Sequence, residues 1–290
     1  MKDHIKTVSD IASQLDALDE GGYDYFHTRT YSVPDRKEII GILKAIQSLM
    51  FPKYFRIDGD SKLSKEDKID KVFYALKRQI SSAFAFLNDD GVVDTEEYAY
   101  KIIESIPKIK GMLIKDVQAI FEGDPAARTP EEVILCYPGF YAISIYRIAH
   151  EFYENKIPYI ARIMTEYAHE KTGIDIHAGA KIGEYFFIDH GTGIVIGETT
   201  TIGKRVKIYQ GVTLGAKSFE LDGDGNPVKG IKRHPDIEDN CIIYANATIL
   251  GGNTRVGAGS VIGASVWLTS SVKPGSVVYY GKNSKESEEK

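Results

Sequence analysis

Residues 195–215 read VIGETTTIGKRVKIYQGVTLG, and an aliphatic residue returns in this stretch at every sixth position. A unit of about six residues is too short for a helical repeat, but it fits a short strand followed by a tight turn. Three such units close one triangular turn of a parallel β-helix, whereas antiparallel strands would alternate with a period of two. We therefore expect each residue of the series to point into a prism. The series is Ile196, Ile202, Ile208 and Leu214.

The same spacing continues on both sides of this stretch. The other members are Ile176, Ile182 and Ile188 upstream, then Ile237, Ile243 and Ile249, and finally Val256, Ile262 and Leu268. Between Leu214 and Ile237 the repeat stops, which predicts an excursion loop over residues 215–236. The DGDGN in this loop does not fit a calcium loop, because Pro227 and Arg233 stand where a glycine and a glutamate are required. We interpret Asp222 and Asp224 as turn formers.

Upstream of residue 174 the apolar spacing changes to three and four residues, as in KEIIGILKAIQSLMF (37–51). This spacing predicts amphipathic helices, and Asp94 and the Thr-Pro-Glu-Glu that begins at Thr129 are typical helix starts. The prediction is an α+β chain. It has an all-helical domain over 1–173, a β-helix of hexapeptide repeats over 174–280, and a short charged tail over 281–290.

Composition excludes several classes of function. The 290 residues carry a net charge of -5, so a nucleic-acid partner has no electrostatic support. No apolar run is long enough to cross a bilayer, and the polar N-terminus does not resemble a secretory signal. The two cysteines, Cys136 and Cys241, lie far apart in sequence, which favours a reducing cytoplasm over a disulfide framework.

Polar residues interrupt the repeat at IDHGTGIVIGE (188–198), where Asp189 and His190 stand side by side. A histidine paired with a carboxylate is a general base for an alcohol or amine. The carboxylate could be Asp175 or Asp189. No nucleophile motif is present, which favours direct transfer to a bound acceptor over a covalent intermediate. Other candidates are His177 and the Arg233-His234 pair that ends the loop.

The motifs resemble the serine O-acetyltransferase family. The resemblance is carried by DIHAGAKIGEYFFIDHGTGIVIGETTTIGKRVKIYQGVTLGA (175–216), by RHPDIEDN (233–240), and by EGDPAARTPEEVILCYPGFYAISIYRIAHEFY (122–153). It implies a left-handed parallel β-helix and transfer of an acetyl group from acetyl-CoA to the hydroxyl of L-serine, the first step of cysteine biosynthesis. No metal is expected.

The resemblance also implies site residues. His190 corresponds to the base and Asp175 to the carboxylate that orients it. Asp124 and Asp189 correspond to the acids that hold the amino end of serine. The remaining matches are Arg233 and His234 for its carboxylate and hydroxyl side, and Gly215, Ala245 and Ala264 for acetyl-CoA.

Assembly follows from the expected shape, because a prism with sites between neighbours requires at least a trimer. The helical half is expected to join trimers into a hexamer, as in many relatives. In those relatives a longer tail ending in isoleucine inserts into O-acetylserine sulfhydrylase. The tail YYGKNSKESEEK (279–290) is short and charged, so we expect that partnership to be weak or absent.

Three alternatives remain open at this point. Another hexapeptide acyltransferase would use the same base on a sugar or other hydroxyl. A γ-class carbonic anhydrase would bind zinc through three histidines, for which His177, His190 and His234 are the candidates. A non-catalytic scaffold would need neither Asp175, Asp189 nor His190.

Overall fold

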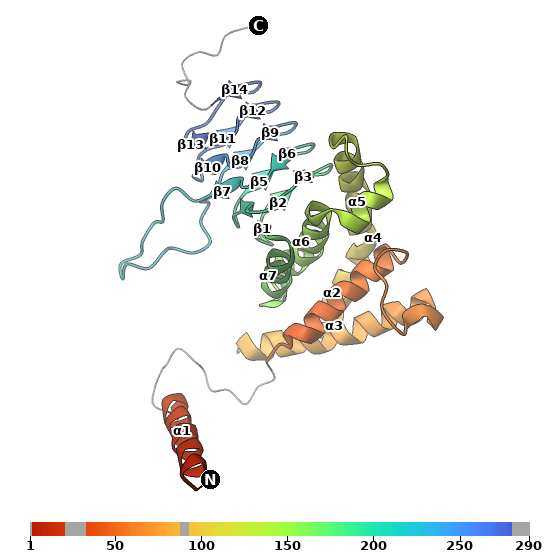
Figure 1. The fold of residues 1–290 in the computed structure, drawn as a ribbon, viewed down its shortest axis with the longest axis vertical. Coiled ribbons are helices and arrows are strands. Elements are labelled where there is room, and N and C mark those ends of the chain that lie inside the picture. The colour runs from red at the N-terminus through yellow and green to blue at the C-terminus, as the bar shows by residue number, and fades with distance from the viewer. Residues whose placement is uncertain (1, 21–32, 88–92, 280–290) are drawn as a thin grey trace.

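Helices form the first half of the chain and a parallel β-solenoid forms the second (Figure 1). The computed structural model describes residues 2–20, 33–87 and 93–279, so the tail over 281–290 lies outside the described residues. The helices are α1 (Lys2–Glu20), α2 (Arg36–Met50), α3 (Lys65–Leu87), α4 (Thr95–Gly123), α5 (Pro130–Cys136), α6 (Pro138–Glu154) and α7 (Ile160–Thr172), with a 3₁₀ turn, η1, at Asp60–Lys62.

The helix starts expected from the sequence are confirmed. The Asp94 side chain accepts hydrogen bonds from the first two free N–H groups of α4, at 3.1 and 3.0 Å. Thr129 caps α5 by accepting the N–H of Glu132 at 3.1 Å, and Pro130 occupies the first helical position. The last helix ends at Thr172 and is capped by Gly173, which has a φ of 69°. The first strand begins two residues later.

The solenoid consists of three parallel sheets. Sheet A contains β1, β4, β7, β10 and β13; sheet B contains β2, β5, β8 and β11; sheet C contains β3, β6, β9, β12 and β14. Strands β1 to β13 occupy sheets A, B and C in turn, as a triangular solenoid requires. After β13 an isolated bridge between Val272 and Val256 takes the place of a strand in sheet B, and β14 lies in sheet C. The strands are β1 (Asp175–Ile176), β2 (Lys181–Ile182), β3 (Phe187–Asp189), β4 (Val195–Ile196), β5 (Thr201–Ile202), β6 (Lys207–Tyr209), β7 (Thr213–Gly215), β8 (Asp236–Ile237), β9 (Ile242–Ile243), β10 (Thr248–Leu250), β11 (Arg255–Val256), β12 (Val261–Ile262), β13 (Trp267–Leu268) and β14 (Val277–Val278).

The six-residue series is confirmed as the core of the solenoid, because every member of it is buried. Members three units apart stack in register: Ile196 pairs with Ile176 on one side and with Leu214 on the other. Each Å² of apolar surface that these stacked side chains withdraw from water stabilises the fold by about 25 cal/mol. Each side of the triangle therefore buries one aliphatic side chain, and this requirement sets the six-residue period.

The excursion loop leaves the prism between β7 and β8 and projects from it (Figure 1). Its tip is a tight turn in which Oδ1 of Asp222 accepts the N–H groups of Asp224 and Asn226, at 3.0 and 2.9 Å. An antiparallel bridge between Leu221 and Pro227 closes the turn. Asp222 is thus a turn former, as expected. Among the described residues no group of three or more histidine, cysteine or acidic side chains is arranged to hold a metal ion.

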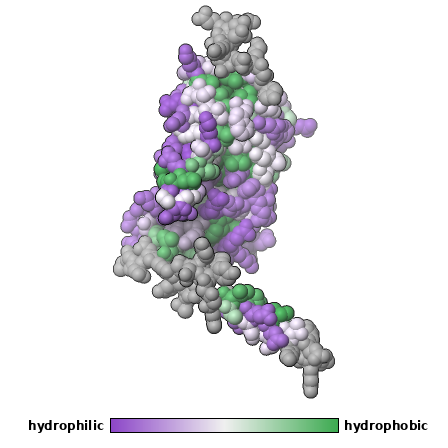
Figure 2. Space-filling model, turned by 90° about the vertical axis from the view of Figure 1, so that its left-hand side faces the viewer, coloured by the Kyte–Doolittle hydropathy of each residue, from purple (hydrophilic) through white to green (hydrophobic). Residues whose placement is uncertain are grey.

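The surface of α1 carries a stripe of exposed apolar residues, which Figure 2 shows as hydrophobic surface along one side of the helix. These residues are Val8, Ile11, Leu15 and Leu18, each more than half exposed. The stripe does not make α1 a membrane span: none of the helices in 2–20, 33–87 and 93–279 combines the length and the apolar character that crossing a bilayer requires.

Candidate active site

The first cluster of candidate residues lies where the chain passes from sheet C to sheet A, here named edge 1. Eight positions separate Ile188 from Ile196 instead of six, and the two extra residues fall in the turn after β3. His190 has a φ of 55° and Gly191 a φ of 87°, so the turn is left-handed. The imidazole of His190 is 72% exposed. The break in the repeat therefore presents His190 to solvent.

Two carboxylates stand near His190. Asp189 accepts the backbone N–H of His190 at 2.8 Å, and its other oxygen lies 3.8 Å from Nε2 of the ring. Asp124 comes from the C-terminal end of α4, where Tyr137 donates to it at 2.6 Å and the N–H of Ala126 at 2.8 Å. The Tyr137 hydrogen bond is the main cause that lowers the pKa of Asp124, with smaller contributions from Ala126 and His190. Edge 1 thus has two acceptors suited to an ammonium group.

Asp175 also lies at edge 1, as the first residue of β1. Its N–H donates to the carbonyl of Ile194 at 2.9 Å, and the preceding Ile174 lies against Gly191. Within the described residues, however, no hydrogen bond joins the Asp175 carboxylate to His190. The backbone places Asp175 beside the turn, and its role as the orienting carboxylate stays a prediction.

The second cluster lies where the chain passes from sheet A to sheet B, here named edge 2. Arg233 forms an ion pair with Glu198, with Nη2 and Oε2 2.5 Å apart. The hydroxyl of Thr199 accepts the N–H groups of Arg233 and His234 at 3.0 and 3.1 Å. The backbone carbonyl of Thr199 accepts a hydrogen bond from the Lys232 side chain at 2.5 Å. The returning end of the excursion loop is therefore fastened to the turn between β4 and β5.

His234 is held in this cluster as a neutral ring. Burial, followed by the positive charge of Arg233, lowers its pKa to about 4. The N–H of Thr199 donates to Nδ1 at 3.1 Å, and the Thr199 hydroxyl lies 2.9 Å from the same atom. A nitrogen that accepts a hydrogen bond carries no proton, so the proton of the neutral ring is on Nε2. His234 can therefore donate to an oxygen without carrying a charge.

Gly197 makes the position of His234 possible, and Gly197→Ala tests it. A Cβ at Gly197 would lie 2.1 Å from Cδ2 and 2.2 Å from Nε2 of His234, so the imidazole must move. We expect the free energy of unfolding to fall by about 1–3 kcal/mol, the usual cost of overpacking, and any activity that depends on His234 to fall with it. Urea denaturation and an assay of that activity measure the two effects.

The matched control is Gly111→Ala on α4, where a Cβ meets nothing within 4 Å. Alanine is the better helix former by about 1 kcal/mol, so this variant should be slightly more stable than the wild type and equally active. If Gly197→Ala behaved like Gly111→Ala, the close packing of His234 against Gly197 would be contradicted.

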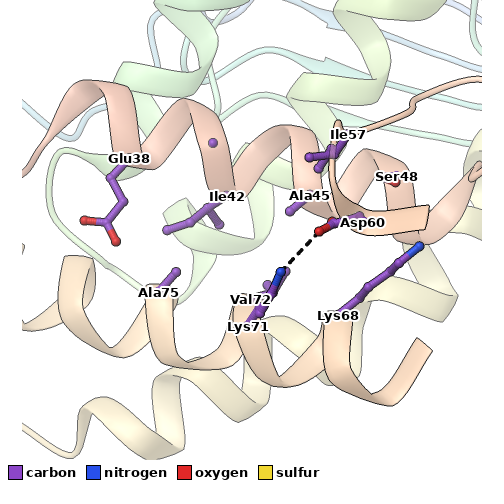
Figure 3. Close-up of a pocket in the computed structure, with 11 residues that line it drawn as sticks. Glu38, Ile42, Ala45, Ser48, Ile57, Asp60, Lys68, Lys71, Val72 and Ala75 are labelled. Atoms are coloured by element: carbon purple, nitrogen blue, oxygen red, sulfur yellow. Dashed lines mark hydrogen bonds and ion pairs between the residues drawn. The ribbon is translucent and has the colours of Figure 1, made fainter. Parts of the chain in front are cut away.

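Each half of the described part of the chain has a hollow in its surface. One, of about 840 Å³, lies between the excursion loop and the prism and is lined by Glu198, Arg233 and loop residues that include Phe219 and Val228. The other, of about 270 Å³, lies between α2 and α3 (Figure 3). Its lining combines apolar residues such as Ile42 and Val72 with charged ones, two of which, Lys71 and Asp60, pair with each other at 3.2 Å. The first hollow contains one predicted site residue, Arg233, and the second contains none.

The expected acetyl-CoA residues divide between the two edges. Ala245 and Ala264 lie in successive turns of edge 1, where the N–H of Ser265 donates to the carbonyl of Ala245 at 2.9 Å. Gly215 ends β7 and therefore lies at edge 2. Edge 1 also holds Asp124, Asp189 and His190. Within one chain the predicted residues thus form two groups on different edges of the prism, and they do not form a single cluster.

The sequence interpretation missed four residues that organise these groups: Tyr137 at edge 1, and Glu198, Thr199 and Tyr153 at edge 2. Glu198 and Thr199 follow Gly197 in a turn of the repeat, which marks them only as turn residues. Their partners at 233 and 234 are about 35 positions away, and the length of the intervening loop does not predict the contact.

The comparisons with known proteins agree with one another, although no family model matches the chain. A relative from Synechococcus elongatus named "Serine acetyltransferase, plasmid" is 45% identical over 269 residues, which are 86% of this chain and 82% of the relative. The crystal structure of Entamoeba histolytica serine acetyltransferase 1 in complex with L-cysteine is 37% identical, covers 93% of this chain and 97% of that chain, and superimposes with a TM-score of 0.71.

A third comparison extends the agreement to a serine complex. The Neisseria gonorrhoeae serine acetyltransferase in complex with serine is 28% identical, covers 87% of this chain and 97% of its own, and has a TM-score of 0.56. These relatives support neither a sugar acetyltransferase, a γ-class carbonic anhydrase nor a scaffold. The expected fold and activity are confirmed: the chain belongs to the serine acetyltransferase family, whose members are acyltransferases.

Proposed function

We propose that acetyl transfer to serine takes place at edge 1, with His190 as the general base. The observation that carries this proposal is the exposed His190 in the turn where two extra residues interrupt the repeat, with Asp189 and Asp124 beside it. Serine acetyltransferases use acetyl-CoA as co-substrate, and the residues at edge 1 fit both the amino end of serine and its hydroxyl.

The proposed chemistry needs no covalent enzyme intermediate. His190 removes the proton of the serine hydroxyl as its oxygen attacks the thioester carbonyl of acetyl-CoA, and a tetrahedral intermediate forms. When the intermediate collapses, the C–S bond breaks and the CoA thiolate takes the proton from the imidazolium. The products are O-acetylserine and CoA. A base within hydrogen-bond reach contributes about 10²–10⁴-fold to such a step. Asp175, or Asp189 beside the ring, orients the imidazole.

The charges of the two edges match a zwitterionic amino acid. The ammonium group fits between Asp124 and Asp189, and the carboxylate fits the guanidinium of Arg233. The neutral Nε2–H of His234 is a donor suited to the hydroxyl side of serine or to the oxyanion of the tetrahedral intermediate. The amino acids in the crystal structures of the Neisseria and Entamoeba relatives, serine and L-cysteine, have the same two charged ends.

Because the two groups lie on different edges, one complete site needs two copies of the chain. Edge 1 of one protomer would face edge 2 of the next, and repetition around a threefold axis gives a homotrimer with sites at its interfaces. Acetyl-CoA would then lie along this interface, against Ala245 and Ala264 of one protomer and Gly215 of the other. The helical half would join two trimers into a hexamer.

Complementation between two variants tests the shared site, with turnover measured at serine concentrations far below the KM, where His190→Ala lacks the base and Arg233→Ala binds serine poorly. His190→Ala and Arg233→Ala each remove one half of every site. In trimers formed by co-expression of equal amounts, a site is intact when an Arg233→Ala protomer supplies His190 and the correct neighbour supplies Arg233. About one quarter of the sites should meet this condition and restore about one quarter of the wild-type turnover.

The control for complementation is co-expression of His190→Ala with Asp189→Ala, which both damage edge 1. Here no intact site can form, because every edge 1 carries one of the two substitutions. A shared site predicts recovery only in the first mixture. Recovery in neither mixture, with trimers present by light scattering, would place the complete site within one chain.

Two further predictions belong to this proposal. The cytoplasmic location rests on the two cysteines, which are free, with Cys136 exposed and Cys241 buried. The weak or absent sulfhydrylase partnership rests on the charged sequence of the tail. A pull-down that showed tight association dependent on residues 281–290 would contradict it.

A further inference from the structure

Arg233 is held by a carboxylate that leaves most of its donors available. Its Nη2 donates to Oε2 of Glu198 at 2.5 Å, with side chains 22% and 24% exposed. Among the described residues no hydrogen bond uses Nε or Nη1 of Arg233. An arginine presents five N–H donors in a rigid fork, so a fixed Nη2 sets the direction of the others. The position of Glu198 therefore decides where Arg233 can meet a substrate.

Glu198 is itself fixed by the helical half of the chain. Its second oxygen, Oε1, accepts the hydroxyl of Tyr153 at 2.8 Å, and Tyr153 belongs to the last turn of α6. Burial raises the pKa of Glu198, but the hydrogen bonds from Tyr153 and Arg233 outweigh it and the net pKa is lowered. Glu198 thus stays ionised, with each oxygen held by a different donor.

The Tyr153 ring is locked in place. A Cβ at Gly179 would lie 2.7 Å from Cζ and 2.9 Å from the hydroxyl oxygen, so only glycine at this position lets the ring approach the solenoid. The ring packs against His177 in a T-shaped arrangement, with centroids 5.7 Å apart and planes at 84°. The pKa of Tyr153 is raised to about 12 by burial and by the hydrogen bond to Glu198, so its hydroxyl remains a donor.

From these contacts we propose that Tyr153 is a positioning residue for the acceptor amino acid, acting through Glu198 on Arg233. The proposal rests on the proposed role of Arg233 as the group that receives the substrate carboxylate. Tyr153 does not touch the substrate. Its hydroxyl fixes one oxygen of Glu198, the other oxygen fixes the guanidinium, and the helical half thereby sets the affinity of the solenoid for serine.

Tyr153→Phe removes the hydroxyl and keeps the ring. Loss of one hydrogen bond to a charged group that supports binding is expected to raise the KM for serine about tenfold. The kcat and the KM for acetyl-CoA should stay within about twofold, because the contact supports binding of one substrate and not the chemical step. Steady-state kinetics with each substrate varied in turn measures this division.

The matched control is Tyr146→Phe on the same helix. Its hydroxyl is buried and donates to the carbonyl of Ala180 at 2.5 Å, whereas Arg233 and Glu198 have no hydrogen bond to either residue among the described contacts. This variant should lose thermal stability without any change in the KM for serine. An equal rise in the KM for serine in both variants would overturn the proposal, because it would assign the effect to general loosening of α6.

Arg233→Ala separates failure of this proposal from failure of the proposed function. If Arg233→Ala raises the KM for serine and Tyr153→Phe does not, Arg233 keeps its role and the contribution of Tyr153 is refuted. If Arg233→Ala leaves the KM for serine unchanged, the role of Arg233 is wrong and the proposal falls with it. In the double variant, Tyr153→Phe should add nothing to Arg233→Ala, because both act on one contact.

Serinamide gives an independent readout, since it has the hydroxyl and the ammonium group but no carboxylate. Tyr153→Phe should lower kcat/KM for serine about tenfold and leave kcat/KM for serinamide within about twofold of the wild type. An equal loss with both acceptors would contradict action through Arg233.

Discussion

Replacing His190 with asparagine is expected to lower kcat for serine acetylation by about 10²–10⁴-fold, the contribution of a positioned general base. Asparagine is the sharper choice because His190 has a φ of 55°, and asparagine tolerates the left-handed conformation. The amide cannot accept the hydroxyl proton at neutral pH. Thiol release from acetyl-CoA, measured with serine, homoserine and a sugar acceptor in parallel, reports the loss and the acceptor preference.

His190→Ala and His169→Ala complete this experiment. Alanine lacks the base too, but in a left-handed turn it costs about 1–2 kcal/mol of stability, so His190→Ala should be less stable than His190→Asn and equally inactive. His169 is a half-exposed histidine near the end of α7, and its replacement should leave kcat unchanged. Undiminished turnover in His190→Asn would remove His190 from the mechanism.

The fold was predictable because the residues whose burial stabilises it recur at a short, regular spacing in the sequence. Burial of one aliphatic side chain per side of the prism imposes the six-residue spacing that places Ile196 over Ile176. The break at Asp189-His190 was visible for the same reason, since two residues beyond the six-residue spacing must project from the prism. The helix starts at Asp94 and Thr129 depend on contacts within four residues and were equally accessible.

The partners of the site residues were not predictable, because they depend on where separate elements meet. Glu198 and Arg233 are joined by an excursion loop of irregular shape, and nothing in its sequence fixes where Arg233 returns. Tyr137 reaches Asp124 only because α5 and the end of α4 lie side by side. The sequence alone also gave no reason to divide the predicted site residues into groups, whereas the stacking of the turns places them on two edges of the prism.

Replacing Arg147 with methionine is expected to lower the free energy of unfolding by about 3–5 kcal/mol, the usual cost of breaking a buried ion pair. Arg147 and Asp116 have side chains 4% and 0% exposed and are joined by two hydrogen bonds, of 2.5 and 2.9 Å. Arg147 also donates to the carbonyls of Ile182 and Gly183 at 3.2 and 2.8 Å. The pair therefore fastens α4 and α6 to the first turn of the solenoid. Urea denaturation measures the loss.

The pH dependence of Arg147→Met follows from the charge left behind. Burial raises the pKa of Asp116, and Arg147 is the main group that opposes this effect. Without Arg147 the folded-state pKa rises further above the unfolded value, so folding binds a proton. Stability should then increase as the pH falls from 7 towards the unfolded pKa of Asp, about 3.9. The wild type should show a weaker dependence of this kind.

Asp116→Asn in the Arg147→Met background distinguishes a stranded charge from lost packing. Asparagine keeps an oxygen for the N–H of Phe186, which Asp116 accepts at 2.9 Å, and it removes the buried charge. The double variant should therefore recover most of the stability lost in Arg147→Met and lose its pH dependence. Lys101→Ala, which breaks an exposed pair with Glu97, should change stability by less than about 1 kcal/mol. If the double variant were as unstable as Arg147→Met, the loss would come from the carbonyls of Ile182 and Gly183. The ion pair itself would then contribute little to the junction between the helices and the solenoid.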